Sequence, residues 1–379
     1  MISSRPIRSV VFLTYHFPPE VGGIQTRISK YVEKLGTRGI RVTVIVAGRK
    51  PFRASVIGEN VVVCTGGLSL LPKNSAAVAG AIIRARADVM HVFTGASTIL
   101  ALSALLMATS LRVSTVISVF GREDLDLPSF FQRMVFRVSG SLARVVDVNS
   151  SATATLLPEK FRGKSYVLLG GADEPDTLPA YDLMEPPSFL FVGRLTARKG
   201  VDDLLKAFAI VKSRYREARL SVVGDGPERE GLVSLASSLG LADSVRFTGS
   251  LWGEELRHEY ARCCALVLPS KNVPTDSANE GLGLTLIEAS MHGKPLIGTR
   301  HGGIPEVVRD GENGLLVPPS DPAALSQALL KIIENKPLAR MMGETGYRLA
   351  KSTLTWERAT DRLLESYKSV RSSARPKQR

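Results

Sequence analysis

Short apolar runs alternate with longer helical stretches along almost the whole chain, and this pattern constrains the fold more than any other feature. The runs are apolar on both faces, which is typical of parallel strands covered by helices. In the first half the predicted strands are Val10–Thr14, Arg41–Val46, Asn60–Cys64, Val89–Phe93, Ser114–Val119, Val145–Asn149 and Ser165–Leu169. In the second half they are Ser188–Val192, Arg219–Val223, Val245–Phe247, Ala265–Leu268, Pro295–Thr299 and Leu315–Val317. The fold class that this predicts is α/β, with two doubly wound Rossmann-like domains.

Proline and acidic residues interrupt the alternation once, over residues 173–187, and this composition is typical of a linker. A chain of 379 residues has room for two domains with cores of ordinary size. The predicted parts are an N-terminal domain (1–172), the linker (173–187), a C-terminal domain (188–352) and a final amphipathic helix with a basic tail (353–379). Because open α/β sheets bind ligands at the carboxyl ends of their strands, we expect the two domains to face each other across a cleft.

A glycine-containing acidic stretch, from Asn279 to Ala289, contains the strongest candidate site. It places the carboxylates of Glu280 and Glu288 eight positions apart. Gly281 and Gly283 allow the backbone to turn tightly and to approach a ligand without a Cβ in the way. The alternative is an ordinary helix start with one surface Glu and one capping Glu.

A helix is predicted from Leu284 to Met291, directly after these glycines. The free N–H groups of Leu284 and Thr285 would then point toward the concave side of the loop. Unsatisfied donors and the helix dipole both favour negative charge at such an end. A carboxylate before this end and another within the helix suit a ligand that carries sugar hydroxyls around a phosphate.

Two cations five positions apart, Arg194 and Lys199, follow the predicted strand that ends near Gly193 and lead into a helix over Val201–Arg214. Arg offers a planar fork of donors and Lys a point charge, a combination that suits a diphosphate. The alternative for each residue alone is a solvated surface side chain. The sequence therefore predicts a second anion-binding edge in the same domain.

These residues belong to a larger set of motifs, in consistent order and spacing from about Phe189 to Leu330. The motifs are Glu280-x7-Glu288, Phe191-Val192-Gly193-Arg194 with Lys199-Gly200, Val223-Gly224-Asp225-Gly226-Pro227, Phe247-x-Gly249, Leu268-Pro269-Ser270, Gly293-Lys294-Pro295, Gly302-Gly303-Ile304-Pro305-Glu306 and Asn313-Gly314-Leu315-Leu316-Val317. The amino half matches more loosely, through Phe17-Pro18-Pro19, Gly22-Gly23-Ile24 and Leu35-x3-Gly39-Ile40-x-Val42-x-Val44. With these motifs the chain resembles the retaining GT-B glycosyltransferases of the family-4 type, which use nucleotide-diphosphate sugars.

The resemblance implies a hexosyltransferase that acts on a glycan or lipid-linked acceptor, in the synthesis of cell-surface polysaccharide or glycolipid. Glu288 would then bind the ribose hydroxyls and Glu280 the donor-sugar hydroxyls, while Arg194 and Lys199 would stabilise charge on the leaving diphosphate. The other candidate donor contacts are Gly22, Gly23, Gly193, Gly281, Gly283, Leu284 and Thr285. In this family the last helix crosses back to the first domain, and we expect the same of residues 353–379.

One departure from the family pattern follows the fifth predicted strand. Many relatives carry a His-Gly pair there, whereas this chain has Phe120-Gly121, and a phenyl ring can neither donate a hydrogen bond nor move a proton. The candidate cleft contacts are therefore Phe120, Arg122 and Glu123; a strand end with a turn glycine is the alternative. Among the histidines, a structural role is favoured for His91, and surface positions are expected for His292 and His301.

Other chemistries have weaker sequence support. The stretch Gly224-Asp225-Gly226 begins like a dinucleotide fingerprint, but the position of its last glycine is Arg229. The motif Asp124-Leu125-Asp126 has the D-x-D shape of metal-dependent transferases, yet it stands without other carboxylates and is better explained as a loop turn. We expect no metal and no cofactor. A sugar-nucleotide epimerase or a phosphorylase on the same fold, and a non-catalytic sugar-nucleotide binder, stay open as alternatives.

Composition bears on location and partners. The three cysteines form no disulfide framework, so a reducing, cytoplasmic location is expected. Twenty uncharged residues, Val92–Leu111, could nominally span a bilayer. Several serines and threonines interrupt them, and Gly95 is expected to separate a strand from a helix, so a buried domain helix is favoured.

The charge is uneven: residues 1–175 hold 21 Lys and Arg against 11 Asp and Glu. No nucleic-acid-binding motif accompanies this excess, so an anionic membrane surface or a phosphorylated acceptor is the expected partner rather than nucleic acid. A candidate face for peripheral membrane contact is formed by Phe130, Phe131, Met134, Val135 and Val138, interleaved with Arg133 and Arg137. The alternative is that this stripe belongs to the core.

Overall fold

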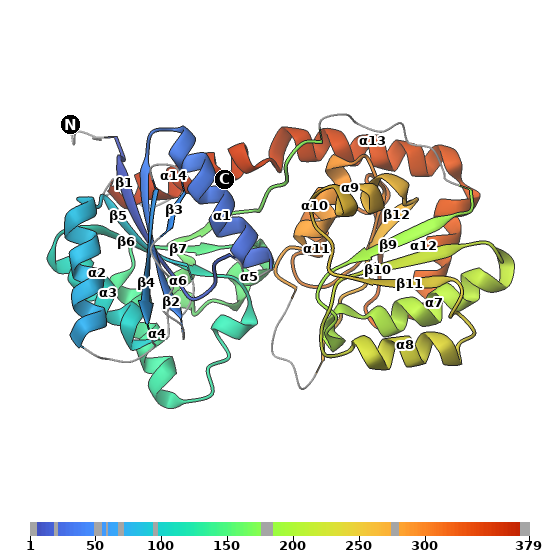
Figure 1. Cartoon of the computed structure of the whole chain (residues 1–379), viewed down its shortest axis with the longest axis horizontal. Coiled ribbons are helices and arrows are strands. Elements are labelled where there is room, and N and C mark those ends of the chain that lie inside the picture. The colour runs from blue at the N-terminus through green and yellow to red at the C-terminus, as the bar shows by residue number, and fades with distance from the viewer. Residues whose placement is uncertain are drawn as a thin grey trace. The chain divides into compact units, whose positions relative to one another are not determined.

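The computed structural model describes residues 6–18, 22–48, 55–57, 60–66, 72–93, 98–175, 185–273 and 280–371. Contacts within the chain divide it into two compact units. The first unit comprises Met1–Leu169 with Trp356–Arg379, and the second comprises Gly170–Thr355. Each unit is a sheet with helices on both faces (Figure 1). The predicted domain bounds stay a prediction, as do acceptor binding by the N-terminal domain and nucleotide-sugar binding by the C-terminal domain. Residues 176–184 of the predicted linker lie outside the described residues.

The first unit contains an eight-stranded sheet with the order β3-β4-β2-β1-β5-β6-β7-β8. Its strands are β1 (Ser9–Thr14), β2 (Arg41–Gly48), β3 (Ser55–Ile57), β4 (Asn60–Gly66), β5 (Val89–Val92), β6 (Ser114–Val119), β7 (Val145–Val148) and β8 (Ser165–Val167). Neighbouring strands pair in parallel, except that β3 pairs antiparallel with β4. Such a parallel sheet requires a crossover between successive strands, and helices supply most of them.

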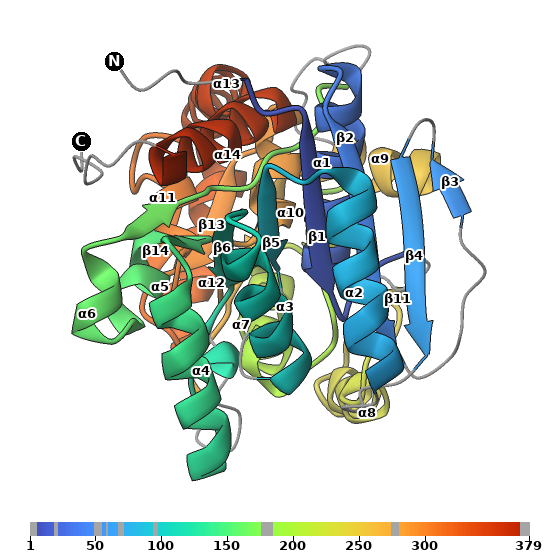
Figure 2. The same cartoon turned by 90° about the vertical axis from the view of Figure 1, so that its left-hand side faces the viewer.

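The helices of the first unit are α1 (Gly23–Thr37), α2 (Pro72–Ala85), α3 (Ile99–Ser110), the 3-10 turn η1 (Arg122–Asp124), α4 (Phe130–Leu142), α5 (Ser151–Leu156), α6 (Glu159–Arg162) and α14 (Trp356–Arg371). Helices α2, α3 and α4 lie side by side on one face of the sheet, and α1 and α14 cover the other (Figure 2). The end of the chain is therefore part of the first unit.

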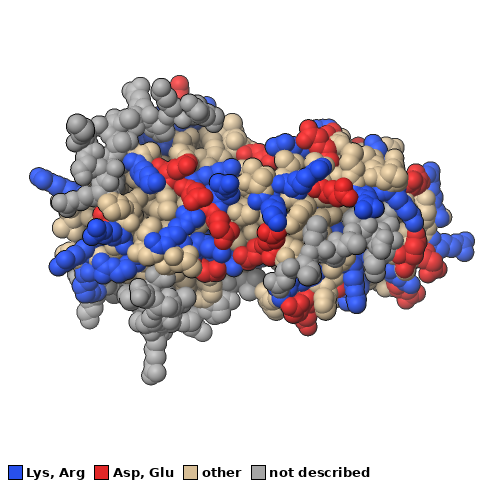
Figure 3. Space-filling view, turned by 90° about the horizontal axis from the view of Figure 1, so that it is seen from above, with Lys and Arg blue, Asp and Glu red and all other residues tan. Residues whose placement is uncertain are grey.

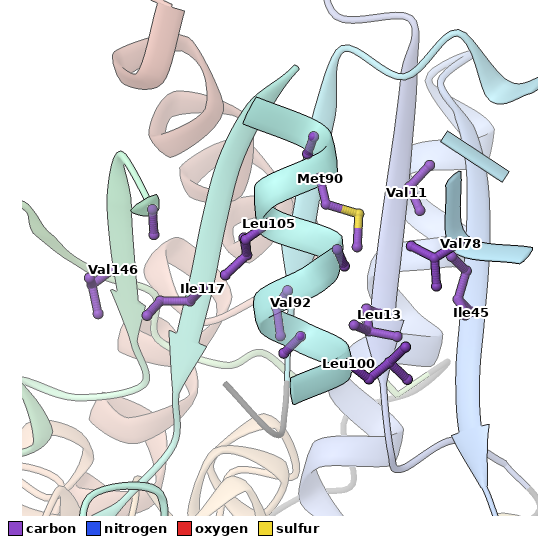
Figure 4. Packing of buried hydrophobic residues seen from close by; sticks show 14 of the residues in the cluster. Val11, Leu13, Ile45, Val78, Met90, Val92, Leu100, Leu105, Ile117 and Val146 are labelled. Carbon is purple, nitrogen blue, oxygen red and sulfur yellow. The ribbon is translucent and has the colours of Figure 1, made fainter. Parts of the chain in front are cut away.

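The core of this unit follows the alternation of side chains along each strand. Val11 and Leu13 of β1 point toward the α2–α4 face, where they join Met90, Ile117 and Val146 of the neighbouring strands in one apolar cluster (Figure 4). The residues between them in sequence point toward α1 and α14. Both faces of the central strands are thus buried, as the uninterrupted apolar runs in the sequence predict.

The second unit contains a six-stranded parallel sheet with the order β11-β10-β9-β12-β13-β14. Its strands are β9 (Ser188–Val192), β10 (Arg219–Val223), β11 (Val245–Gly249), β12 (Ala265–Leu268), β13 (Leu296–Thr299) and β14 (Gly314–Val317). Its helices are η2 (Ala197–Lys199), α7 (Val201–Arg214), α8 (Arg229–Ser238), α9 (Gly253–Arg262), α10 (Leu284–Met291), α11 (Ile304–Val307), α12 (Pro322–Glu334) and α13 (Lys336–Thr353). Helix α7 packs against α8 and α12, and α10 packs against α13 on the opposite side (Figure 1).

The predicted fold class is confirmed, because every strand expected from the sequence is present within two residues of its expected bounds. Strand β3 was not predicted, since three residues are too few to show a pattern. The uncharged stretch Val92–Leu111 separates into the end of β5 and the twelve-residue helix α3, while Gly95 itself lies outside the described residues. Among the described residues, no helix is both long and apolar enough to cross a membrane.

Candidate functional site

Strand order in the second unit indicates where a ligand can bind. From β9 the chain adds β10 and β11 on one side, then returns to add β12, β13 and β14 on the other. Open α/β sheets bind ligands beyond the carboxyl ends of the strands at such a reversal. Arg194 and Lys199 follow β9 at this point, and Ser270 follows β12. The predicted cations therefore lie at the edge where this fold places its ligands.

Glu280 is a buried carboxylate at this edge. It is 6% exposed, and its Oε2 accepts hydrogen bonds from Lys199 Nζ at 2.6 Å and from Ser270 Oγ at 2.8 Å. The guanidinium of Arg198 lies 3.8 Å from the same oxygen. The structure thus brings together Lys199 and Glu280, which the sequence predicted as parts of one site. Ser270 and Arg198 are additional contacts of Glu280 that were not predicted from the sequence.

The two cations determine the charge state of Glu280. Burial alone would raise the pKa of this carboxyl, but Lys199 and then Arg198 outweigh it, so the pKa lies below its ordinary value. Glu280 is therefore ionised at neutral pH. One anion between two cations leaves an excess of positive charge, which favours a ligand with an anionic group, while the carboxylate can accept hydrogen bonds from hydroxyls.

The segment that carries Lys199 is held in place by a separate ion pair. Lys271, after β12, donates from Nζ to Asp202 at 2.7 Å and to Asp203 at 2.8 Å in the first turn of α7. Its backbone N–H also donates to the carbonyl of Arg198 at 2.8 Å. The loops after β9 and β12 are therefore joined to each other, which fixes the position of Lys199 relative to Ser270.

The loop after β13 supports Glu280 from another direction, since the N–H of Gly303 donates to the Glu280 carbonyl at 3.0 Å. His301 in this loop is 7% exposed; burial lowers its pKa, and nearby Glu280 opposes that shift. Surface positions were expected for His301 and His292, and both expectations are wrong. His292 is 9% exposed, and its ring stacks on Tyr260 with centroids 5.2 Å apart. Both rings are covered by packing between distant segments, which residue polarity does not reveal.

Helix α10 has the bounds that the sequence predicted. Its N-cap residue, Gly283, has φ 79°, in the left-handed region. A Cβ added there would lie 2.8 Å from Leu268 Cδ2, so both the backbone and the packing against β12 favour glycine. The first-turn N–H groups of Leu284 and Thr285 have no acceptor within the helix, and the helix dipole adds partial positive charge. This end of α10 suits an anion.

Glu288 lies one turn inside α10 and contacts α9. The hydroxyl of Tyr260 donates to Glu288 Oε2 at 2.6 Å. Burial raises the pKa of the Glu288 carboxyl, although the hydrogen bond from Tyr260 opposes this. Tyr260 is thus a partner that fixes one carboxyl oxygen. Tyr260 could not be predicted as a site residue, because it belongs to none of the recognised motifs.

Arg194 differs from Lys199 in its surroundings. Its side chain is exposed and forms no ion pair with any residue that the structure describes. The preceding Gly193 is half-buried at the end of β9, where its N–H donates to the carbonyl of Val223 at 3.0 Å. Arg194 is therefore anchored through its backbone and has its guanidinium available.

The first unit has a corresponding strand-end edge, because its strand order reverses between β1 and β5. Gly22 is the N-cap of α1 and Gly23 its first residue, so both follow β1 at this edge. Phe120 follows β6, but it is only 6% exposed and its ring stacks near that of Phe93, with centroids 6.4 Å apart. The guanidinium carbon of Arg27 lies 5.5 Å from the centre of the Phe120 ring. Phe120 therefore fills space beside the core.

The acidic motif after Phe120 closes a turn. Asp124 Oδ2 accepts a hydrogen bond from the Phe120 N–H at 2.7 Å, and Asp126 pairs with Arg122 at 3.2 Å. These contacts agree with the interpretation of the D-x-D motif as a loop turn. Arg122 is exposed, and the side chain of Glu123 lies outside the described residues.

A layer of buried polar side chains lies on the face of the first sheet that α1 and α14 cover. His91 of β5 is fully buried; its Nε2 is 2.8 Å from Ser118 Oγ and its Nδ1 is 2.7 Å from the hydroxyl of Tyr367 in α14. Asp147 of β7 lies 3.8 Å from His91 and accepts a hydrogen bond from Ser366 at 3.2 Å. Burial lowers the pKa of His91 to about 3, so the imidazole is neutral. The structural role favoured for His91 agrees with this position.

Parts of both units match known protein families. Residues 179–349 match the family described as glycosyl transferases group 1, and residues 21–174 match glycosyltransferase family 4. The GDP-mannose-dependent alpha-(1-6)-phosphatidylinositol monomannoside mannosyltransferase of Mycolicibacterium smegmatis is 30% identical over 373 residues, covering 94% of this chain and 97% of that protein. The D-inositol 3-phosphate glycosyltransferase of Streptomyces coelicolor is 35% identical over 195 residues, covering 49% of this chain and 41% of that protein.

Solved structures show the same fold. Sucrose-phosphate synthase from Thermosynechococcus elongatus superposes with a TM-score of 0.77 at 21% identity, covering 96% of this chain and 98% of the other. HepE of Anabaena, in complex with UDP and glucose, superposes with a TM-score of 0.73 at 18% identity, covering 96% of this chain and all of the other. At these identities the likeness concerns the fold.

Proposed function

The chain belongs to the group 1 glycosyltransferases of family 4, and from this premise we propose that it transfers a hexosyl group from a nucleotide-diphosphate sugar with retention of configuration. It is an enzyme of the hexosyltransferase type that uses a nucleotide sugar. The finer proposal concerns the donor contacts, the course of the reaction and the acceptor.

The observation that carries the proposal is the carboxylate of Glu280, held ionised between Lys199 and Arg198 at the reversal point of the second sheet. The N-terminus of α10 follows within four residues. Cations and free N–H groups supply positive charge for a diphosphate, and the carboxylate supplies an acceptor for sugar hydroxyls. A site for a purely apolar ligand or for a bare anion would not need the buried carboxylate.

Roles for individual residues follow. Glu280 binds hydroxyls of the donor sugar, and Glu288, fixed by Tyr260, binds the ribose hydroxyls. Arg194 contacts the diphosphate directly. Lys199 contributes charge to the leaving group and also keeps Glu280 in position. The N–H groups of Gly283, Leu284 and Thr285 add to the stabilisation of that charge.

Retention is proposed to proceed on one face of the sugar, because no side chain of the site is assigned as a nucleophile. The acceptor oxygen forms a bond to the anomeric carbon while the bond from that carbon to the diphosphate breaks. The departing phosphate takes the proton of the acceptor hydroxyl. The cations and the end of α10 offset the diphosphate charge, so we propose a reaction that needs no divalent metal.

GDP-mannose is the first donor to test, and an inositol-containing lipid the first acceptor, because the full-length relative from Mycolicibacterium smegmatis uses this chemistry. UDP- and ADP-sugars serve as comparison donors. Each donor is incubated with the protein, with and without EDTA, and thermal shift and release of nucleotide diphosphate are measured.

A transferase should release nucleotide diphosphate slowly without acceptor and faster with it, and EDTA should leave both rates unchanged. An epimerase would interconvert the sugars, and a simple binding protein would show a thermal shift without turnover. Release that EDTA abolishes would overturn the metal-independent proposal, and an inverted linkage in the product, read by NMR, would overturn retention.

A further inference from the structure

Helix α4 of the first unit exposes an apolar face to solvent. Phe130 is 74% exposed, Phe131 50%, Met134 46% and Val138 41%. The opposite side of the same helix is packed in the core, where Val135 is 2% exposed. The stripe noted in the sequence is therefore only partly core: Val135 is buried, and the other four apolar residues are not. Several large apolar side chains exposed on one helix are typical of an interaction surface.

The four exposed apolar residues form a continuous face. Phe130 and Met134 are four positions apart, and Phe131 and Val138 are seven apart, so both pairs fall on the outward side of the helix. Arg133 and Arg137, also exposed, form a second row along one edge of this face. Helix α3 lies beside α4 (Figure 2) and also carries an exposed apolar residue, Leu106. We call the four apolar residues and two arginines of α4 the α4 face.

The charged residues within α4 and directly beside it in sequence are all basic. Residues 127–146 contain three arginines and no acidic residue. Lys160 lies at the end of α4, where its Nζ donates to Ser141 at 3.0 Å. By contrast, basic and acidic residues are mixed on the side of this unit that carries α1 and α14, with Lys34 and Glu357 paired at 2.6 Å (Figure 3). The positive charge of residues 127–146 is thus not offset by acidic residues of the same segment, and Asp126, which precedes it, pairs with Arg122 at 3.2 Å.

We propose that the α4 face docks on an anionic lipid bilayer, with its apolar side chains in the interfacial region and its arginines at the phosphates. A helix with aromatic and aliphatic groups outward and arginines along one edge suits this interface, because arginine can extend to the headgroups while its stem lies on apolar surface. Arg133 donates from Nη1 to the carbonyl of Leu127 at 2.8 Å, and neither Arg133 nor Arg137 forms an ion pair with an acidic residue that the structure describes. Anionic lipid would supply the negative charge for both. A second copy of this chain fits less well, since a symmetric contact would bring the same arginines together.

The test uses the full chain and sedimentation with vesicles of phosphatidylcholine alone or mixed with phosphatidylglycerol. Wild type should bind the mixed vesicles, and binding should weaken as salt rises. The double variant Phe130→Ser with Phe131→Ser should weaken binding at least tenfold. Arg133→Gln with Arg137→Gln should weaken it and reduce its dependence on salt. The control, Ile210→Ser with Arg216→Gln, changes an exposed apolar residue and an exposed arginine in the second unit and should bind like wild type.

Nucleotide-sugar hydrolysis without acceptor should be the same in all these variants, which separates this test from that of the proposed function. Circular dichroism and thermal unfolding identify any variant that fails to fold, in which case Met134→Ser is used alone. Equal binding of wild type and the α4 variants, or no binding to anionic vesicles at low salt, would overturn the proposal. So would a wild-type dimer in sedimentation velocity that the Phe130→Ser, Phe131→Ser variant loses, since a second copy would then cover the α4 face.

Discussion

Arg194 and Lys199 occupy similar places in the sequence, but they have different surroundings, and this difference can be tested. Arg194→Ala removes an exposed guanidinium without an ion pair among the described residues, so it should lower kcat by roughly a hundredfold and leave thermal stability unchanged. Lys199→Ala should lower kcat similarly, but it also leaves Glu280 with fewer partners. We expect it to reduce the free energy of unfolding by roughly 2 kcal/mol.

Steady-state kinetics and urea unfolding measure the two effects. Arg216→Ala is the matched control, because Arg216 is another exposed arginine of the second unit without an ion pair among the described residues. Near wild-type turnover in Arg194→Ala would remove Arg194 from its proposed role. Unchanged stability of Lys199→Ala would show that Arg198 and Ser270 suffice to hold Glu280.

The two carboxylates should separate binding of the nucleotide from transfer of the sugar. Glu288→Gln should weaken the affinity for free nucleoside diphosphate, because Glu288 is proposed to contact the ribose. Glu280→Gln should leave that affinity almost intact and lower the rate of transfer. Tyr260→Phe removes only the hydrogen bond to Glu288 and should give a milder form of the Glu288 effect. If calorimetry showed that Glu280→Gln weakens the affinity for nucleoside diphosphate more than Glu288→Gln does, the assignment would be wrong.

At the residue scale, the sequence predicted part of the candidate site. Glu280, Lys199 and Glu288 could be found because they stand in motifs with fixed spacing. Ser270 was visible within a motif, but nothing indicated that its hydroxyl binds Glu280, ten positions away. His301 was misplaced because its burial depends on packing of the loop after β13. Contacts between separate loops depend on how the strands are ordered in the sheet. The pattern of apolar runs in the sequence does not reveal that order.

At the scale of elements, the close approach of the loops after β9 and β12 requires a residue without a side chain. Gly200 has φ 68°, and a Cβ there would lie 2.1 Å from the carbonyl oxygen of Pro269. Gly240 has almost the same φ, 70°, but a Cβ there would meet nothing within 4 Å. Gly240→Ala should therefore cost about 1 kcal/mol, from the backbone alone. Gly200→Ala should cost at least about 2 kcal/mol more, because the backbone of a neighbouring loop must move.

Urea unfolding of the two variants measures these free energies. Because Gly200 and Gly240 have nearly the same φ, the strain of placing alanine at that φ cancels when the two values are compared. Gly200→Ala should also reduce donor hydrolysis, since the shift would displace Lys199. Equal destabilisation by the two substitutions would mean that the loops after β9 and β12 can separate at no cost.

Elements were predicted better than their contacts for a physical reason. Strands that are buried on both faces show as apolar runs whatever lies beside them, so strands such as β10 and β12 have the bounds that the sequence predicted. Strand β3 is different, because it is a three-residue antiparallel edge strand. The sequence also did not show which apolar residues of α4 are buried and which are exposed. A helix with apolar residues on both sides shows only one broad apolar stripe in its sequence.

At the scale of the whole molecule, the last helix completes the first unit. In α14, Trp356 and Tyr367 are buried to 2% and 0% exposure, and Lys34 and Arg38 of α1 pair with Glu357 and Asp361 at 2.6 and 2.8 Å. Composition alone showed only a lone amphipathic helix, and the resemblance to the family suggested where it goes. A chain that returns to its first unit makes the stability of that unit depend on its last residues.

His91 joins this last helix to the sheet and should give the protein a measurable pH dependence. Its pKa is lowered by burial to about 3, below the ordinary value of 6.5. Between these values the unfolded chain binds more protons at His91 than the folded protein does, so stability is lost as pH falls from 6.5 toward 3. His91→Gln removes this proton uptake. The difference in unfolding free energy between wild type and His91→Gln should therefore shrink by about 3 kcal/mol from pH 6.5 to pH 4.

Urea unfolding at several pH values measures this difference. Tyr367→Phe is the control, because it removes the hydroxyl 2.7 Å from His91 Nδ1 but leaves the imidazole buried, so its pH dependence should follow wild type. Asp147 is present in all three proteins, but it lies 3.8 Å from His91, so the difference between wild type and His91→Gln reports on the pair. A difference between wild type and His91→Gln that stays constant across this range would mean that the imidazole can be protonated in place. The contact between β5 and α14 would then have to open to water without unfolding the first unit.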